Sequence, residues 1–149
     1  MRTTLTISIL VALVACSAGT KEKGPDKPPS ADNTLFARLG GQAAINAVVD
    51  EFVDMTGADP RISQYFTNVD KDKLKTSMYV HVCSISGGGC TYEGKSMLVA
   101  HTGMKLSQAD FDAFMDDLSK TLIKLKVPEP QQGEVVAAFR AMQTDVVGH

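Results

Sequence analysis

One histidine lies in the stretch of this sequence whose residue types best fit a chemical role. His101 ends a short apolar run that begins at Met97, and the run follows a turn from Tyr92 to Gly94. Histidine is the commonest metal ligand in proteins, and a neutral imidazole at the end of a short helix is a good axial ligand for haem iron. His101 is therefore a candidate metal ligand, and the alternative is a histidine with a purely structural role.

Two cysteines and a second histidine offer a different chemistry. Structural zinc is bound by nitrogen and sulfur ligands, and His81, Cys83, Cys90 and His101 form such a set. Their spacing fits no common zinc template. In an oxidising compartment Cys83 and Cys90 are a candidate disulfide pair, since the glycine-rich segment between them is flexible enough to let them meet, and two free thiols are the equal alternative.

The elements that must position these residues are predicted to be helices. Apolar residues recur at helical spacing in four segments, and no segment shows the sustained alternation typical of a strand. The four apolar stripes are Ile45, Val48, Val49 and Phe52; Leu74, Met78, Val82 and Ile85; Phe111, Phe114, Met115, Leu118, Leu122 and Leu125; and Val135, Phe139, Met142 and Val146. The predicted fold class is therefore all-α.

Glycines, prolines and a capping signal separate these segments. Ser107 and Asp110 resemble a capping box with Asp in place of the usual Glu, so a helix should begin there. The other breaks are Gly40-Gly41 after a short first helix, Asp59-Pro60, Gly87 to Gly89, the Tyr92-x-Gly94 turn, and Pro128 with Pro130.

The N-terminal residues resemble an export signal rather than part of the fold. Residues 1–15 combine Arg2 with an apolar run that is short for a membrane span, as in a signal peptide. The run ends in a lipobox-like sequence at Cys16, so we expect cleavage there and lipidation of Cys16, with burial of acyl chains holding the protein at the membrane. The alternative is an ordinary secretory signal followed by an incidental cysteine.

Two further segments follow from this interpretation. Residues 16–33 contain the lipidated cysteine and a linker rich in Pro, Lys, Gly and Ser, which buries too little apolar surface to fold. Residues 34–149 then form one domain. By resemblance to lipoproteins of Gram-negative bacteria, Ser17 favours the periplasmic face of the outer membrane over the inner membrane.

The helical segments and their breaks together resemble the group I truncated haemoglobins. The resemblance is carried by Leu35 to Gly41, Asp59 to Phe66, Gly87-Gly88 with Tyr92-x-Gly94, Met97 to His101, and Leu106-Ser107 with Phe111. It implies a truncated globin fold, a two-over-two helical sandwich around haem b. It also implies a globin that reversibly binds a diatomic ligand, O2, CO or NO.

The resemblance assigns roles to individual residues. It implies that His101 is the proximal iron ligand, that Phe66 stacks on the porphyrin, and that Lys75 and Tyr92 lie near the propionates. The remaining cofactor-binding positions that it implies are Leu74, Met78, Met97, Leu106, Phe111 and Leu118.

The distal side departs from the family pattern. The family commonly has a Tyr directly after the Phe of the second helix and a Gln on the distal helix, whereas Phe52 is followed here by Val53, and the distal positions are Leu74 and Met78. A missing hydrogen bond to bound dioxygen costs about 1–3 kcal/mol, or about ten- to hundredfold in affinity. The expected distal pocket of Phe52, Val53, Leu74, Met78 and His81 is thus largely apolar.

His81 leaves an alternative open. It lies on the same helix face as Leu74 and Met78, so either His81 or Met78 is a candidate sixth iron ligand. A six-coordinate haem protein would suit electron transfer with a redox partner or redox sensing in the envelope.

Other functions have weaker support in the sequence. A haem-free helical lipoprotein that binds a partner leaves the run from Tyr92 to His101 without a role. The formal net charge of −2 and the absence of a basic run argue against nucleic-acid binding. No phosphate-binding loop, nucleophile elbow or metalloprotease motif occurs, so any catalysis would belong to the haem.

Overall fold

The computed structural model describes residues 33–149, and all of its regular elements are helices. In chain order they are α1 (Leu35–Arg38), α2 (Gly41–Ala58), the 3-10 helix η2 (Ser63–Phe66), α3 (Lys71–Ile85), α4 (Met97–His101), α5 (Gln108–Lys124), α6 (Glu129–Arg140) and α7 (Gln143–Val146). The predicted signal peptide and Cys16 lie outside the described residues. None of the helices in this part of the chain is long and apolar enough to cross a membrane.

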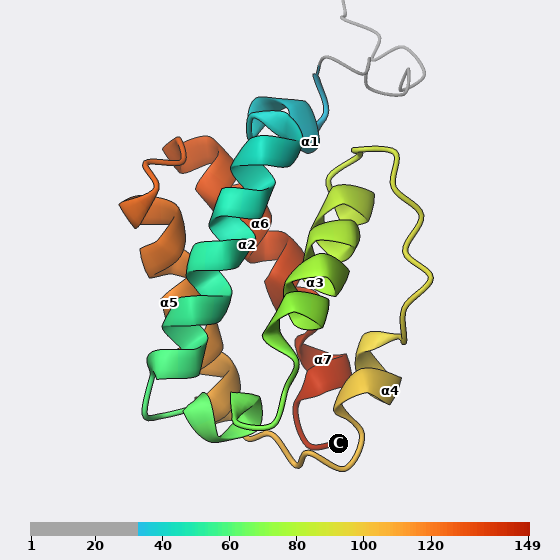
Figure 1. Cartoon of the computed structure of the whole chain (residues 1–149), viewed down its shortest axis with the longest axis vertical. Helices are drawn as coiled ribbons and strands as arrows, with labels where there is room; N and C mark the ends of the chain where they lie inside the picture. The colour runs from blue at the N-terminus through green and yellow to red at the C-terminus, as the bar shows by residue number, and fades with distance from the viewer. Residues whose placement is uncertain (1–32) are drawn as a thin grey trace, which may run out of the picture.

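Two antiparallel helix pairs form the body of the domain. Helices α2 and α3 pack together as one pair, and α5 and α6 pack together as the other (Figure 1). Helix α2 also packs on α5 and so joins the two pairs. The short helix α4 lies beside α7 and the C-terminus, apart from the four long helices (Figure 1). This arrangement is the two-over-two sandwich that the sequence predicts.

The predicted breaks lie where the helices end. Gly40 and Gly41 adopt positive φ values of 99° and 71° between α1 and α2, a conformation that glycine adopts without steric cost. Ser107 and Asp110 form the predicted capping box at the start of α5, each side chain bonding the backbone N–H of the other residue. The sequence therefore encodes these boundaries locally.

The core is unevenly distributed among the long helices. Helix α5 contributes seven buried residues and α2 contributes five, whereas α3 contributes only Cys83. The apolar stripe of α3 is only partly buried, and its last member, Ile85, is exposed. One face of α3 thus borders a space that protein atoms do not fill.

The last apolar stripe does not belong to a single helix, contrary to the sequence-based expectation. Helix α6 ends at Arg140, and Met142 caps the separate helix α7. Val146 nevertheless packs into the same core cluster as Val135 and Phe139. A helical period continues across this break because α7 begins only three residues after α6 ends.

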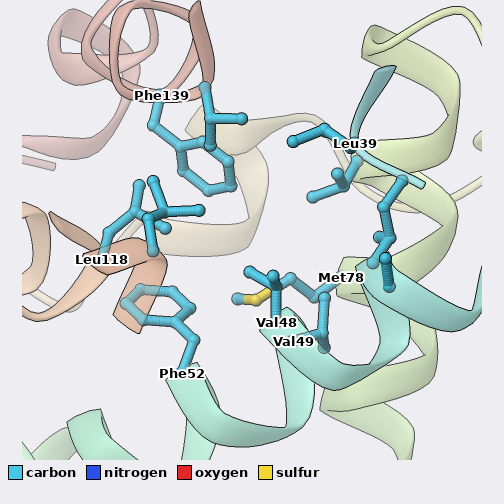
Figure 2. A pocket seen from close by; sticks show the side chains of 12 residues that line it. Leu39, Val48, Val49, Phe52, Met78, Leu118 and Phe139 are labelled. Carbon is cyan, nitrogen blue, oxygen red and sulfur yellow. The ribbon is translucent and has the colours of Figure 1, made fainter. Parts of the chain in front are cut away.

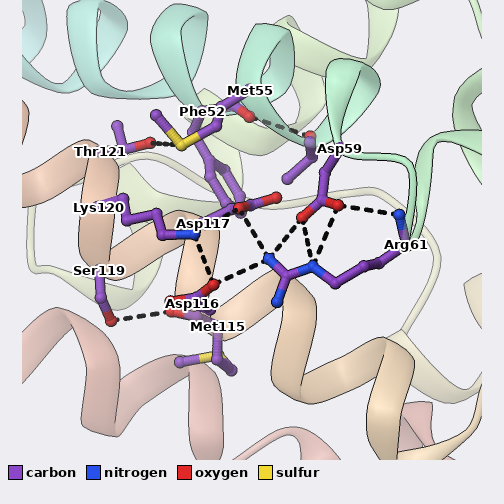
Figure 3. A network of polar contacts seen from close by, with 11 residues as sticks. Phe52, Met55, Asp59, Arg61, Met115, Asp116, Asp117, Ser119, Lys120 and Thr121 are labelled. Carbon is purple, nitrogen blue, oxygen red and sulfur yellow. Dashed lines mark hydrogen bonds and ion pairs between the residues drawn. The ribbon is translucent and has the colours of Figure 1, made fainter.

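A network of charges holds the connector between α2 and α3 against α5. Arg61 lies in this connector, and its Nη2 is 2.8 Å from Asp116 Oδ2 and 3.4 Å from Asp117 Oδ1 (Figure 3). Arg61 also pairs with Asp59 at the end of α2, and Lys120 pairs with Asp116. The connector is therefore attached to α5 mainly by ion pairs.

Two carboxyl groups of this network titrate in opposite directions. The hydrogen bonds that Arg61 donates lower the pKa of Asp59 to about 2. Burial, together with the neighbouring charge of Asp59, raises the pKa of Asp117 to about 6 from an ordinary value of 3.8. Asp117 Oδ2 is buried and has no hydrogen-bond partner among the described residues.

These shifts predict how stability depends on pH. The folded state binds the Asp117 proton more tightly than the unfolded chain does, so this group's stabilising contribution is complete below pH 3.8 and is lost as pH rises through about 6. Asp59 acts oppositely, and its contribution is lost as pH falls from 3.8 towards 2. In wild type, ionisation of Asp117 should lower the unfolding free energy between about pH 4.5 and 7.5. We expect Asp117→Asn to lack this decrease, because Asn does not titrate. Urea denaturation at both pH values measures it, and identical pH dependence in the two proteins would contradict the assignment.

Candidate functional site

A cavity opens between α3, α4 and α5. Its volume is about 460 Å³, within the range typical of sites for small molecules and cofactors. Its walls are mostly apolar and come from every helix except α1 and α2. The lining residues are Ile62, Tyr65, Phe66, Val69, Leu74, Ser77, Met78, His81, Tyr92, Gly94, Lys95, Met97, Ala100, His101, Met104, Leu106, Asp110, Phe111, Phe114, Phe139, Met142 and Val146.

His101 is held in one tautomer at the wall of this cavity. Its Nδ1 lies 2.7 Å from the backbone carbonyl oxygen of Met97, one turn earlier in α4. A carbonyl oxygen only accepts hydrogen bonds, so Nδ1 must carry the ring proton. In the neutral ring Nε2 is then the nitrogen with the free lone pair, and a backbone bond of this kind is the usual way in which a metal-binding histidine is oriented.

The opposite wall is supplied by α3 and carries few polar groups. Leu74 and Met78 line the cavity, one turn apart, and Ser77 lies between them. His81 follows one turn later, with its Nε2 3.3 Å from the sulfur of Met142. Its Nδ1 is buried and has no hydrogen-bond partner in the described part of the chain. Burial lowers the pKa of His81 and so favours its neutral imidazole form.

The 3-10 helix η2 and the start of α5 form a third wall. Phe66 and Tyr65 come from η2, and the Tyr65 hydroxyl donates to Asp110 Oδ2 at 3.2 Å. The same Asp110 oxygen accepts from the backbone and the side chain of Ser107 in the capping box, which lowers the pKa of Asp110. The polar groups of this wall therefore bond each other, while Phe66 and Phe111 present aromatic surface to the cavity.

The two cysteines are joined. Cys83 and Cys90 form a disulfide with their Cα atoms 5.6 Å apart. A sulfur in a disulfide has no thiolate to give to a metal ion, so the alternative zinc set of His81, Cys83, Cys90 and His101 is removed. Among the described residues, no other group of three or more His, Cys, Asp and Glu side chains is placed to hold a metal ion.

Most of the residues that the sequence singled out meet in this one cavity. Nine of them line it: Phe66, Leu74, Met78, His81, Tyr92, Met97, His101, Leu106 and Phe111. They come from four helices, η2, α3, α4 and α5, and from the loops before α4 and α5, so their meeting is a property of the fold.

Four residues that the sequence assigned to the haem site do not line this cavity. Lys75 does not line the cavity, because its Nζ lies 3.5 Å from Asp50 and 3.3 Å from Asp54 on α2. Leu118 and Phe52 instead border a second, much smaller cavity of about 20 Å³ between α2, α5 and α6 (Figure 2). Val53 is fully buried in the cluster between α2 and α3. Met78 is the one distal residue that borders both cavities.

Sequence analysis missed Lys95. It lines the cavity two residues before the start of α4 and is the only Lys or Arg side chain to do so. Lys95 lies in a loop, so it belongs to none of the helical stripes used to select residues. Its closeness in sequence to Tyr92, which was expected near the propionates, could have identified it. Phe114, Phe139 and Met142 also line the cavity and were assigned only to apolar stripes.

Comparison with known proteins agrees with this fold. The family model of bacterial-like globins matches residues 34–147. A group 1 truncated haemoglobin of Tetrahymena thermophila is 35% identical over 115 residues, which cover 77% of this chain and 95% of that protein. One of Synechocystis sp. is 34% identical over 113 residues, covering 73% of this chain and 91% of that protein. The chain therefore belongs to the bacterial-like globin family, among the group 1 truncated haemoglobins.

Solved structures support the same placement. The Fe(III) form of the truncated haemoglobin of Tetrahymena pyriformis has a TM-score of 0.75 and 32% identity, over 78% of this chain and all of that one. The 2/2 haemoglobin of Synechococcus sp. PCC 7002, in the cyanomet state with covalently attached haem, has a TM-score of 0.73 and 31% identity, over 78% of this chain and 99% of that one.

Proposed function

We propose that this protein binds haem b in the large cavity, with His101 as the proximal iron ligand, and that it reversibly binds a diatomic ligand. The observation that carries the proposal is the fixed tautomer of His101, whose bond to the Met97 carbonyl leaves Nε2 as a free ligand at the cavity wall. When bound, the haem supplies the iron that a diatomic ligand occupies.

The other walls fit such a group. Haem b is a flat, largely apolar ring with two carboxylates at one edge. Phe66 and Phe111 offer aromatic contacts, and Met97 and Leu106 offer aliphatic ones. Lys95, which is exposed at the cavity, supplies the positive charge that suits a propionate carboxylate.

The distal wall gives the proposed ligand site its character. Solved mutants of the Tetrahymena pyriformis protein replace one tyrosine and two glutamines that follow it by 21 and 25 residues. Leu74 and Met78 follow Val53 by the same 21 and 25 residues. The Tetrahymena pyriformis protein thus has three polar side chains where this chain has Val53, Leu74 and Met78 at the same spacing. These three apolar side chains offer a bound ligand no hydrogen-bond donor.

This wall favours ligands that need no donor. Carbon monoxide and nitric oxide depend less on a hydrogen bond than dioxygen does, so high-affinity dioxygen storage fits poorly. Six-coordination by His81 has little support, because its Nε2 contacts Met142 and its ring contacts Tyr92. Met78 remains the internal ligand to test, since it lines the cavity from the centre of α3.

The proposed location is the cell envelope, with a lipid on Cys16 as the attachment. The support is the lipobox-like sequence before Cys16 and the linker that follows it. The disulfide in the folded domain is consistent with an oxidising compartment. Mass spectrometry of the N-terminal peptide from membranes tests the lipid, and an unmodified Cys16 would contradict it.

Haem ligation by His101 is tested by His101→Gly. We expect wild type reconstituted with haem to show a Soret band and a five-coordinate ferrous spectrum, because one imidazole faces an apolar wall. The variant should lose the proximal bond, and added imidazole should restore it by occupying the space that the side chain vacates. Ultraviolet–visible spectra of the ferric, ferrous and CO-bound forms measure this.

The outcomes separate the alternatives. A Soret band that is unchanged in His101→Gly would exclude His101 as the ligand. Low-spin ferrous bands in wild type that disappear in Met78→Leu would show an internal sixth ligand and favour electron transfer. No Soret band in wild type would contradict haem binding altogether.

A donor introduced on the distal wall should slow dioxygen release. In Leu74→Gln, a hydrogen bond of about 1–3 kcal/mol to bound dioxygen should lower its dissociation rate about ten- to hundredfold at 1.4 kcal/mol per decade. Leu74→Met is the matched control, because it keeps a similar volume without a donor. Stopped-flow dissociation measures both, and equal rates in the two variants would show that residue 74 does not face the ligand.

The two lysines predict different effects on haem affinity. Lys95→Ala should weaken haem binding about two- to fivefold, as expected for the loss of an exposed ion pair worth about 0.4–1 kcal/mol. Lys75→Ala should leave haem affinity unchanged, because Lys75 is paired with Asp50 and Asp54. Titration of the apoprotein with haem measures both constants, and the opposite ranking would restore Lys75 as the propionate partner.

A further inference from the structure

The proximal helix packs against α7 and, through Met97, against the core, but its side chains are only partly covered. Helix α4 contains no buried residue, although it carries His101. It is joined to α3 by residues 86–96, a connection without any helix that runs along the outside of the molecule (Figure 1). Whatever fixes this loop therefore contributes to fixing His101.

The first fixed point of the loop is the disulfide. Cys83 is completely buried near the end of α3, and its partner Cys90 lies in the loop. Gly88 passes so close to this bond that a Cβ there would lie 2.7 Å from Cys83 Sγ and would overlap the ring of Phe36. The loop thus starts in a covalently closed turn that is packed under α1.

The second fixed point is Tyr92. Its ring meets the ring of His81 edge to face, with centroids 4.9 Å apart. Its hydroxyl donates to the Lys95 carbonyl oxygen at 3.0 Å, and a Cβ on Gly94 would overlap the same ring. Tyr92 is therefore enclosed by α3 on one side and by its own loop on the other.

The two fixed points form a regular pattern. On α3 the partners are His81 and Cys83, and on the loop they are Tyr92 and Cys90, so the pairs run antiparallel with a two-residue step. Directly beyond them, the Ser96 side chain accepts from the Val99 N–H and starts α4. The hydrogen bond of Tyr92 therefore holds Lys95, which is the residue directly before the capping residue Ser96.

We propose that the disulfide and the Tyr92–His81 contact act as a clasp that holds the proximal helix in position, and that opening the clasp accelerates haem loss. The proposal rests on the proposed haem function and extends it to positioning residues that do not touch the iron. In this role Cys83 and Cys90 retain the cofactor by limiting the freedom of the loop before α4, because a closed turn restricts the chain beyond it.

Three variants of the full chain open the clasp in different ways. Cys90→Ser breaks the disulfide and leaves the buried Cys83 in place as a thiol, which avoids a new cavity. Tyr92→Phe removes only the hydroxyl that bonds Lys95, and Gly94→Ala displaces the Tyr92 ring without altering either member of the contact. Val135→Ala is the matched control, because it removes packing from α6 without touching the loop or the large cavity.

Hydrogen exchange in the haem-free protein provides the first measurement. We expect Cys90→Ser to increase exchange in residues 86–101 while α5 remains as protected as in wild type. Val135→Ala should not produce this local pattern. Unchanged exchange in residues 86–101 of Cys90→Ser would overturn the clasp, whether or not the protein binds haem.

Haem transfer from the ferric holoprotein to an excess of apomyoglobin provides the second measurement. We expect Cys90→Ser to lose haem about tenfold faster than wild type, equivalent to about 1.4 kcal/mol, and Val135→Ala to lose it at the wild-type rate. Combining Cys90→Ser with Tyr92→Phe should give less than the product of the two single effects, because both open the same clasp.

The remaining outcomes are decisive in different ways. If haem loss were accelerated equally in Cys90→Ser and Val135→Ala, the disulfide would only stabilise the domain as a whole. That result would overturn the proposal. Multiplicative effects in the double variant would overturn the joint action of disulfide and tyrosine. A local change in exchange without any Soret band in wild type would contradict the proposed haem function and would leave the clasp as a constraint on the loop alone.

Discussion

The structure depends on building a large apolar cavity into a small domain. A cavity of about 460 Å³ deprives its walls of contacts that a close-packed core would supply, and α3 shows the effect, with Cys83 as its only buried residue. The opposite pair has the denser packing, since α5 buries residues along most of its length. The α2–α5 contact therefore supplies a rigid base against which the less packed elements are held.

The less packed elements are attached by polar and covalent bonds instead. The connector after α2 is held to α5 by Arg61 with Asp116 and by Tyr65 with Asp110. The loop after α3 is held by the disulfide at Cys83. Both segments border the cavity, and Ile62 is the one apolar residue outside the disulfide that either of them buries. Directional bonds fix geometry where burial cannot, although exposed ion pairs add little net stability.

The features of the fold that could be predicted from the sequence were those determined by a few neighbouring residues. Helix boundaries were predictable because glycine conformation and the capping box at Ser107 act within a few residues. Lys75 was expected near the propionates, but a step of one residue from Leu74 is a rotation of about 100° on a helix, and Lys75 lies beside the acids of α2. The break between α6 and α7 was invisible because the apolar period continues across it.

The division between the two cavities also lay beyond sequence patterns. An apolar stripe shows which face of a helix turns inward, but α2 and α5 turn inward towards each other as well as towards α3. Phe52 and Leu118 therefore belong to the small cavity of Figure 2, while Phe111, earlier on the same face of α5, reaches the large one. Met78 of α3 and Phe139 of α6 border both cavities, so these two side chains lie between the two spaces. The unbranched, flexible thioether of Met78 suits a boundary position, because such a side chain changes rotamer at low cost and adapts to whatever occupies the cavity on either side.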